Sequence, residues 1–170
     1  MTDFSQFELG TTAETVSLES IEDHRLAALA LVQQARRKIQ IFSHDLEAPL
    51  YDNLPFATAL VKLVLRSQYS QILILVQDSG RVARDGHRLI DLARQFPSYV
   101  QVRRPPEDYL EHPESFLIVD DVGVLHRRLN YRYEGTVNFA AARQARTLQQ
   151  FFSKVWDVSA PDPELRLLHL

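Results

Sequence analysis

The stretch EHPESFLIVDDVGVLHRR, from Glu111 to Arg128, decides the fold of this chain. It contains an apolar run, FLIV (116–119), two aspartates that suit a turn, and a second run, VGVLHRRL (122–129). Apolar runs joined by a short turn predict paired strands. A third run, EGTVNF (134–139), follows closely enough to extend the pair into a meander.

Upstream of this stretch, strand-like apolar runs alternate with segments of helical periodicity. The expected strands are IQIF (39–42), QILILV (71–76) and YVQV (99–102), and the expected helices span about 20–38, 55–66, 82–96 and, after the meander, 140–157. Such alternation predicts right-handed crossovers between parallel strands. The expected fold class is therefore α/β, with a mixed, largely parallel sheet flanked by helices.

Length and composition exclude several classes of protein. A chain of 170 residues with 45% hydrophobic and 24% charged residues suits one soluble globular domain. The absence of cysteine excludes disulfides, thiolate metal sites and cysteine nucleophiles, and favours a cytoplasmic protein. The longest apolar run, LAALALV (26–32), is far short of the roughly 20 residues that span a membrane. The N-terminus lacks the features of a signal peptide.

Charge is distributed unevenly along the chain. The first 23 residues carry six acids and no base, and we expect residues 1–16 to form an acidic, poorly ordered arm before a domain of residues 17–170. The remaining residues carry 19 bases against 16 acids, and all but three of the bases are Arg. Guanidinium groups match phosphate geometry, so this bias suits anion or nucleic-acid contact. The base composition of a genome explains an Arg excess equally well.

The order of these elements resembles half of a phospholipase D-like phosphodiesterase, a superfamily that includes small nucleases and phospholipid-synthesising enzymes. The resemblance covers most of residues 20–157. The segments that carry it are ALALVQQARRKIQIFS (28–43), FATALVKLVLRSQYSQILILVQD (56–78), FLIVDD (116–121) and ARTLQQFFSKVWD (145–157).

The resemblance implies a specific chemistry. The signature of these enzymes is H-x-K-x-x-x-x-D, followed by G-S-x-N seven residues after the Asp. The His attacks phosphorus, a second His from the other half or another subunit protonates the leaving oxygen, and Lys and Asn hold the phosphoryl oxygens. This chemistry needs no metal or other cofactor. In single-motif members two copies meet across the site, so the resemblance implies a homodimer.

This chain departs from the signature in its first half. When the motif is anchored on Asp120, its His position falls on Pro113 and its Lys position on Ser115. When it is started from His112, its Asp position falls on Val119, one residue short of Asp120. A slip of one residue also turns a strand side chain to the opposite face of the sheet. Every register loses the Lys, so the motif is degenerate.

The second half of the signature keeps one residue. Its Gly and Ser positions fall on Arg127 and Arg128, and its Asn position falls on Asn130. His126 precedes these residues in the same strand. The three cationic side chains predict either a phosphate-binding patch or an exposed strand face, and the exposed face is the ordinary outcome for such a run.

The other candidates are weaker. His112 lies in an acidic loop, where we expect a solvated histidine. Asp120 and Asp121 suit a turn better than a metal site, because spacing fixes no further ligand. The segment SHDLEAPLYD (43–52) follows the first parallel strand, at the end where α/β sheets commonly bind ligands. His44, Asp45, Glu47 and Tyr51 are therefore secondary candidates, although an ordinary loop is favoured.

Three functions follow from these observations. The first is a non-catalytic module for binding or assembly, with a phosphate-containing ligand or nucleic acid as its partner. The second is an active, metal-independent phosphodiesterase or nuclease whose displaced site uses His112 or His126 with Asp120 and Asn130. The third is a protein-interaction domain that has no anion site and docks its partner through the acidic arm and apolar strand edges.

Overall fold

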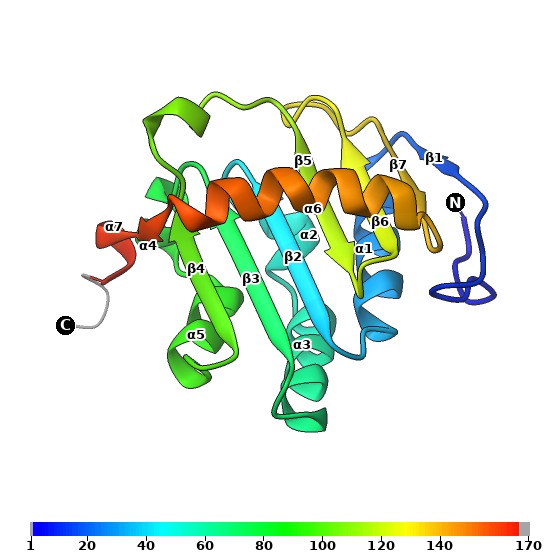
Figure 1. Ribbon diagram of the computed structural model, residues 1–170, viewed down its shortest axis with the longest axis horizontal. Helices are drawn as coiled ribbons and strands as arrows, with labels where there is room; N and C mark the ends of the chain where they lie inside the picture. Colours follow the sequence, from blue (N-terminus) through cyan, green and yellow to red (C-terminus); the bar gives the residue numbers. More distant parts are fainter. Residues whose placement is uncertain (1, 167–170) are drawn as a thin grey trace.

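The computed structural model describes residues 2–166, which fold around one mixed sheet (Figure 1). The strand order is β1-β7-β6-β5-β2-β3-β4-β8. The strands are β1 (Val16–Leu18), β2 (Lys38–Ser43), β3 (Gln71–Val76), β4 (Val100–Arg104), β5 (Ser115–Val119), β6 (Gly123–Arg127), β7 (Gly135–Asn138) and β8 (Ala160–Pro161).

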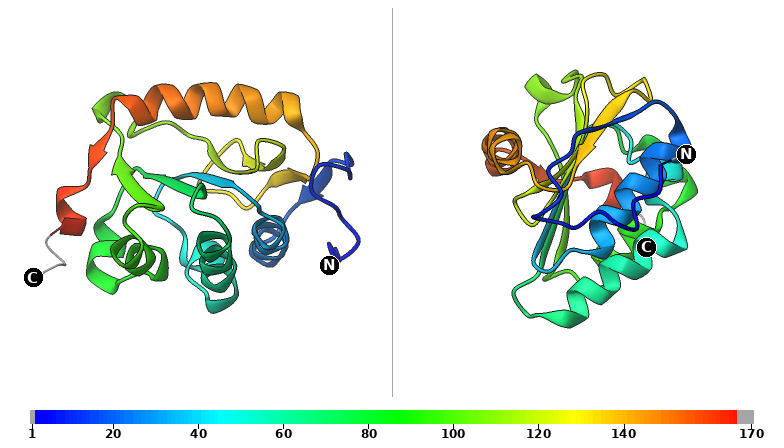
Figure 2. Two further views of the ribbon diagram at one scale, coloured as in Figure 1. Left: turned by 60° about the horizontal axis from the view of Figure 1, so that its bottom comes forward. Right: turned by 90° about the vertical axis from the view of Figure 1, so that its right-hand side faces the viewer.

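Helices cover both faces of the sheet unequally. The helices are α1 (Ile21–Gln33), α2 (Ala48–Tyr51), α3 (Leu54–Arg66), α4 (Gly80–Asp85), α5 (Arg88–Gln95), α6 (Ala142–Asp157) and α7 (Pro163–Arg166), with a 3₁₀ turn at Glu107–Tyr109. Figure 2 shows α6 lying alone across one face, while α1, α3 and α5 line the other. Among residues 2–166, every helix is too short or too polar to span a lipid bilayer.

The sheet is α/β and mixed, as expected, but its parallel part is smaller than expected. Among the described strands, only the β2–β3 and β3–β4 pairings are parallel. The other five pairings among the described strands are antiparallel. The loop after β4 brings β5 back beside β2 without a crossover helix, so β5 runs in the opposite direction and the meander continues from it.

The helix expected at residues 82–96 is in fact two helices, α4 and α5. Gly86, with φ of +76°, occupies a conformation that side chains with a Cβ disfavour, and it ends α4. His87 then begins α5, because its Nδ1 accepts the backbone N–H of Leu89 at 3.0 Å. The break matters for the site described below, since it fixes the position of the His87 ring.

The N-terminal segment is more closely attached to the domain than the expected acidic arm. Phe4 is only 5% exposed and packs with Phe7 and Phe139. The side chain of Gln34, the C-cap residue of α1, accepts the N–H of Leu9 at 2.8 Å and donates to the carbonyl of Phe7 at 2.7 Å. Part of the segment thus contributes to the core.

Two apolar clusters lie on the two faces of the sheet, and alternation along β5 separates them. Leu117 and Val119 belong to the cluster under α1 and α3. Phe116 and Ile118 belong to the cluster under α6, where they pack with Phe152. Because Ser115 pairs with Arg127, these two residues share the α1 side, and His126 falls on the α6 side.

Candidate functional site

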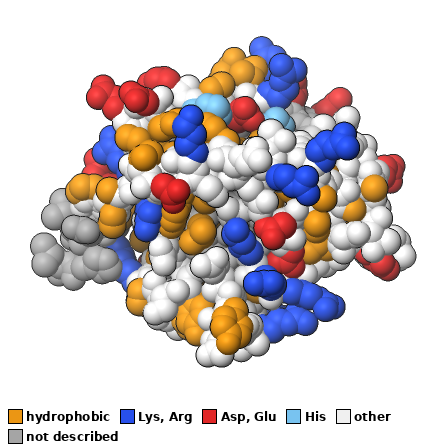
Figure 3. Space-filling view, viewed as in Figure 1, with side chains coloured by type: hydrophobic (Ala, Val, Ile, Leu, Met, Phe, Trp, Pro, Cys, Tyr) orange, Lys and Arg blue, Asp and Glu red, His pale blue; other side chains and the backbone are white. Residues whose placement is uncertain are grey.

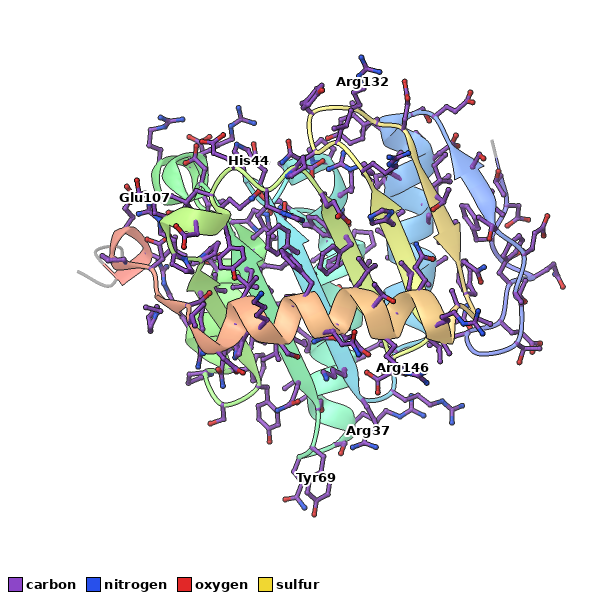
Figure 4. The ribbon with its side chains drawn as sticks, turned by 45° about the horizontal axis from the view of Figure 1, so that its top comes forward. Arg37, His44, Tyr69, Glu107, Arg132 and Arg146 are labelled. Atoms are coloured by element: carbon purple, nitrogen blue, oxygen red, sulfur yellow. The ribbon has the colours of Figure 1, made fainter. Side chains whose placement is uncertain are left out.

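Most of the candidate residues from the sequence lie together where several strands begin or end. We call this end of the sheet the candidate edge. The carboxyl end of β2, the amino end of β5 and the carboxyl end of β6 meet there, with Phe42 opposite Phe116 and Phe116 opposite His126. This is the upper edge in Figure 1, and His44 and Arg132 are labelled along it in Figure 4. Histidine side chains reach the surface near this rim, among acidic and basic neighbours (Figure 3).

Arg127, expected at a ligand-binding surface, is instead 2% exposed. Its guanidinium forms an ion pair with the carboxylate of Glu47, in the loop after β2. The guanidinium also lies over the ring of Tyr133, 4.7 Å from the centroid. The charge of Arg127 is therefore paired with a buried carboxylate, on the face of the sheet that also carries Ser115.

The groups around this ion pair are held in neutral forms. Burial, aided by the negative charge of Glu47, raises the pKa of Tyr133 to about 12. Burial also raises the pKa of Tyr51 above its ordinary range. His24 on α1 is fully buried, and burial lowers the pKa of its imidazole. The arrangement is that of a structural ion pair in an aromatic pocket.

On the α6 side, one carboxylate lies between two histidines. His126 Nε2 donates to Glu114 Oε2 at 2.6 Å. His112 Nε2 lies 3.6 Å from Glu114 Oε1, too far for a hydrogen bond. The His112 ring stacks on Phe151 of α6, with the centroids 4.3 Å apart. Burial lowers the pKa of His112, although Glu114 opposes this shift. His112 is thus half-buried and stacked, not the solvated histidine that we expected.

A cavity of about 770 Å³ opens beside His126. Arg128 and Arg132 line it, are exposed, and form no ion pair among residues 2–166. Glu114 and Glu134 also contribute to the lining. This cavity offers guanidinium groups to an anion and carboxylates to hydrogen-bond donors. Sequence patterns do not single out Glu114 or Arg132 as site residues, because strand pairing and a loop bring them to the cavity.

Asp120 lies away from this edge, at the opposite end of β5. Its carboxylate accepts the backbone N–H groups of Arg36, Arg37 and Lys38 at 2.7, 2.9 and 2.9 Å. Asp120 therefore fixes the entry into β2, and the displaced site that combined it with His112 or His126 does not form.

Asn130 does lie at the candidate edge. Its backbone N–H donates to the carbonyl of Pro113 at 2.7 Å, and its Nδ2 donates to the carbonyl of His112 at 3.4 Å. Asn130 thus holds the loop that carries His112, and its amide is directed at backbone.

The loop after β2 is held by the neighbouring helices. Asp45 lies 3.6 Å from Arg81 of α4, and the carbonyl of His44 accepts the N–H of Asp78 at 2.6 Å. Leu46 has a φ of +56°, and its carbonyl accepts a hydrogen bond from His87 Nε2 at 2.9 Å. These contacts place Glu47 beside Arg127. Residues 2–166 contain no group of three or more His, Asp or Glu side chains suited to a metal ion.

Several solved structures resemble this fold at low sequence identity. TrmBL2, an archaeal chromatin protein whose structure shows a novel mode of DNA binding, has a TM-score of 0.64 and 17% identity over 93% of this chain. Nuc from Salmonella typhimurium, a phospholipase D family member, has a TM-score of 0.62 and 14% identity over 86% of this chain. Phosphatidylserine synthase from Haemophilus influenzae has a TM-score of 0.55 and 14% identity over 92%.

The chain spans 56% of TrmBL2 and 44% of the synthase, but 97% of Nuc. These likenesses confirm the phospholipase D-like fold that the sequence resemblance implied. A search of curated proteins finds no match. The profile of the family described as "Domain of unknown function (DUF7931)" matches residues 20–168, and this chain therefore belongs to that family.

Proposed function

We propose that this chain is a non-catalytic phospholipase D-like domain that binds a nucleotide or a nucleic-acid phosphate in the cavity beside His126. The observation that carries the proposal is that two adjacent arginines have different environments. Arg127 is buried in an ion pair with Glu47, whereas Arg128 lines the cavity with its charge unpaired among the described residues.

Loss of catalysis is supported by what occupies the motif positions. Ser115 stands at the Lys position and donates its hydroxyl to the carbonyl of Phe42 at 3.4 Å. Pro113, at the His position, has no nucleophile. The Gly position holds Arg127, which pairs with Ser115 across the strands and, like Ser115, is buried. A phosphoryl group that approached this point would meet a closed surface and a carboxylate.

Binding is supported by the charge pattern of the cavity. Guanidinium groups donate paired hydrogen bonds to phosphate oxygens, and Arg128 and Arg132 both line the cavity. Glu134, which also lines the cavity, would repel a bare phosphate but accept hydrogen bonds from a sugar hydroxyl or a base amino group. A nucleotide satisfies both kinds of group. TrmBL2, which shares the fold, is described as binding DNA.

Calorimetric titration with thymidine 5′-phosphate tests the proposal. The double variant Arg128→Ala/Arg132→Ala should bind at least about tenfold more weakly, since each lost charged hydrogen bond is worth roughly 1.5–3 kcal/mol. The control is Arg84→Ala/Arg104→Ala, which removes the same charge from exposed positions on α4 and β4. No binding by the wild type, or equal weakening in both double variants, would refute the proposal.

The bond between His126 and Glu114 supports a second candidate, a metal-independent phosphodiesterase. A carboxylate that orients an imidazole is a common way to prepare a base or a nucleophile. This candidate predicts hydrolysis of bis(p-nitrophenyl) phosphate in the presence of a chelator, lost in His126→Ala and His112→Ala. The non-catalytic proposal predicts no release above a buffer blank at high protein concentration.

We also propose a homodimer across this edge, in keeping with the way single-motif members of the superfamily complete their site. Tyr131, 72% exposed on the loop between β6 and β7, is a large apolar side chain at that edge. Light scattering of the wild type and of Tyr131→Glu tests the proposal. The expected result is a dimer that the substitution converts to monomers. A wild-type monomer at all concentrations would contradict it.

A further inference from the structure

The opposite edge of the sheet carries three consecutive basic residues in the segment that enters β2. Arg36 and Arg37 are exposed, and Lys38 is half-buried. Asp120 accepts their three backbone N–H groups, so this carboxylate is directed at the main chain. In Figure 4 the side chain of Arg37 projects from the lower edge, and in Figure 3 basic side chains gather there.

Helix α6 adds to this basic surface. Gln149 bonds the side chain of Gln40 on β2 at 3.0 Å and also contacts Asp121. Lys38 Nζ lies 3.9 Å from Asp121. Arg146, which is exposed, stands one turn before Gln149 on the same face of α6, and is labelled at this edge in Figure 4. The helix therefore places a further cation beside those of the turn.

Helix α3 completes the surface on the other side. A groove of about 540 Å³ between α1 and α3 is lined by Ala35, which directly precedes Arg36, and by Lys62 and Arg66. In the turn after α3, Tyr69 is 72% exposed. This turn lies beside the basic segment, because the first residue of β3 donates its N–H to the Arg37 carbonyl at 2.9 Å.

We infer that this lower edge binds the phosphate backbone of single-stranded nucleic acid. Cations from three elements provide an electrostatic track, and an exposed tyrosine ring provides a platform for a base. The two carboxylates at the edge are already engaged, Asp120 by backbone and Asp121 by Lys38 and Gln149. A single strand fits better than a duplex, because only unpaired bases can stack on Tyr69.

Fluorescence anisotropy with a labelled oligothymidylate at about 50 and about 200 mM salt tests the inference. For Arg36→Ala/Arg37→Ala we expect at least about tenfold weaker binding at the lower salt. We also expect the slope of log affinity against log salt to shrink by about 1.4, since each phosphate contact on a single strand contributes about 0.7. The double variant Arg84→Ala/Arg104→Ala, with the same loss of charge, should bind as the wild type does.

A second arm tests the ring. Tyr69→Ala should weaken binding of the oligothymidylate but not of an abasic strand of equal length. Arg36→Ala/Arg37→Ala should leave binding of thymidine 5′-phosphate in the cavity unchanged, so failure at this edge is distinguishable from failure at the cavity. The inference would be overturned if the wild type did not bind the oligothymidylate. It would also be overturned if Arg36→Ala/Arg37→Ala and the control Arg84→Ala/Arg104→Ala weakened binding equally. An unchanged affinity in Tyr69→Ala would overturn the stacking role.

Discussion

Replacing Arg127 by methionine tests whether the buried ion pair stabilises the candidate edge. Methionine keeps most of the length of the side chain and removes its charge. The carboxylate of Glu47, with a side chain only 10% exposed, would then be left without its cation. Leaving one buried charge unpaired costs about 3–5 kcal/mol. The guanidinium also loses its place over the Tyr133 ring, a contact worth about 0.5–2 kcal/mol.

These losses are large against a total stability of roughly 5–15 kcal/mol. For a domain of this size the melting temperature of Arg127→Met should fall on the order of 10 °C. The double variant Glu47→Gln/Arg127→Met leaves no buried charge, and removal of both partners of an ion pair is often close to neutral. It should therefore be more stable than Arg127→Met, with a coupling energy on the order of 3 kcal/mol between the two substitutions.

Urea unfolding followed by circular dichroism measures the free energy of unfolding for the wild type, the two single variants and the double variant. Glu47→Gln alone serves as the matched single variant, because it leaves the Arg127 charge unpaired. Additive effects of the two substitutions would refute the reasoning. A loss of less than about 1 kcal/mol in Arg127→Met would also refute it, because the Glu47 carboxylate would then be sufficiently solvated without Arg127.

Three further predictions concern single positions. Burial lowers the pKa of His87, so this imidazole binds a proton more readily in the unfolded chain than in the folded protein. The free energy of unfolding should therefore fall as the pH drops below about 6.5, and it should fall less steeply in His87→Asn. Urea titrations across that pH range measure both effects. In Gly135→Ala the new Cβ would lie 2.5 Å from the His126 carbonyl, and thermal melts should show a loss of about 1–3 kcal/mol. Asp120→Asn keeps a residue that tolerates φ of +51° but weakens three hydrogen bonds to backbone, so unfolding titrations should show a loss of roughly 1.5–3 kcal/mol.

Local sequence patterns predicted the long elements well. The run QILILV (71–76) has the same bounds as β3, and the expected meander is present as β5, β6 and β7. The direction of β5 was missed, because hydrophobic periodicity does not record which strands become neighbours. β1 and β8 were missed as well, since three and two residues are too few to show a period.

The candidate site was only partly visible in the sequence for a related reason. Glu47 and Arg127 stand 80 positions apart, and nothing near either residue indicates that they pair. The stacking of His112 on Phe151 likewise depends on where α6 crosses the sheet. Asp120 matches the motif by spacing, yet in the structure its carboxylate accepts hydrogen bonds from three backbone N–H groups. Motif spacing located the edge, but contacts across the fold decide what each side chain does there.

The outer strands of the sheet bear on aggregation. Long unpaired strand edges act as templates for other chains, whereas short ones, and those that contain proline, do not. At one end β1 covers β7, and at the other β8, which includes Pro161, covers β4 at Arg103 and Arg104. The first residues of β4 have no outer neighbour among the described strands. Shortened versions prepared for crystallisation should therefore keep Pro161, because removing β8 would expose the whole edge of β4.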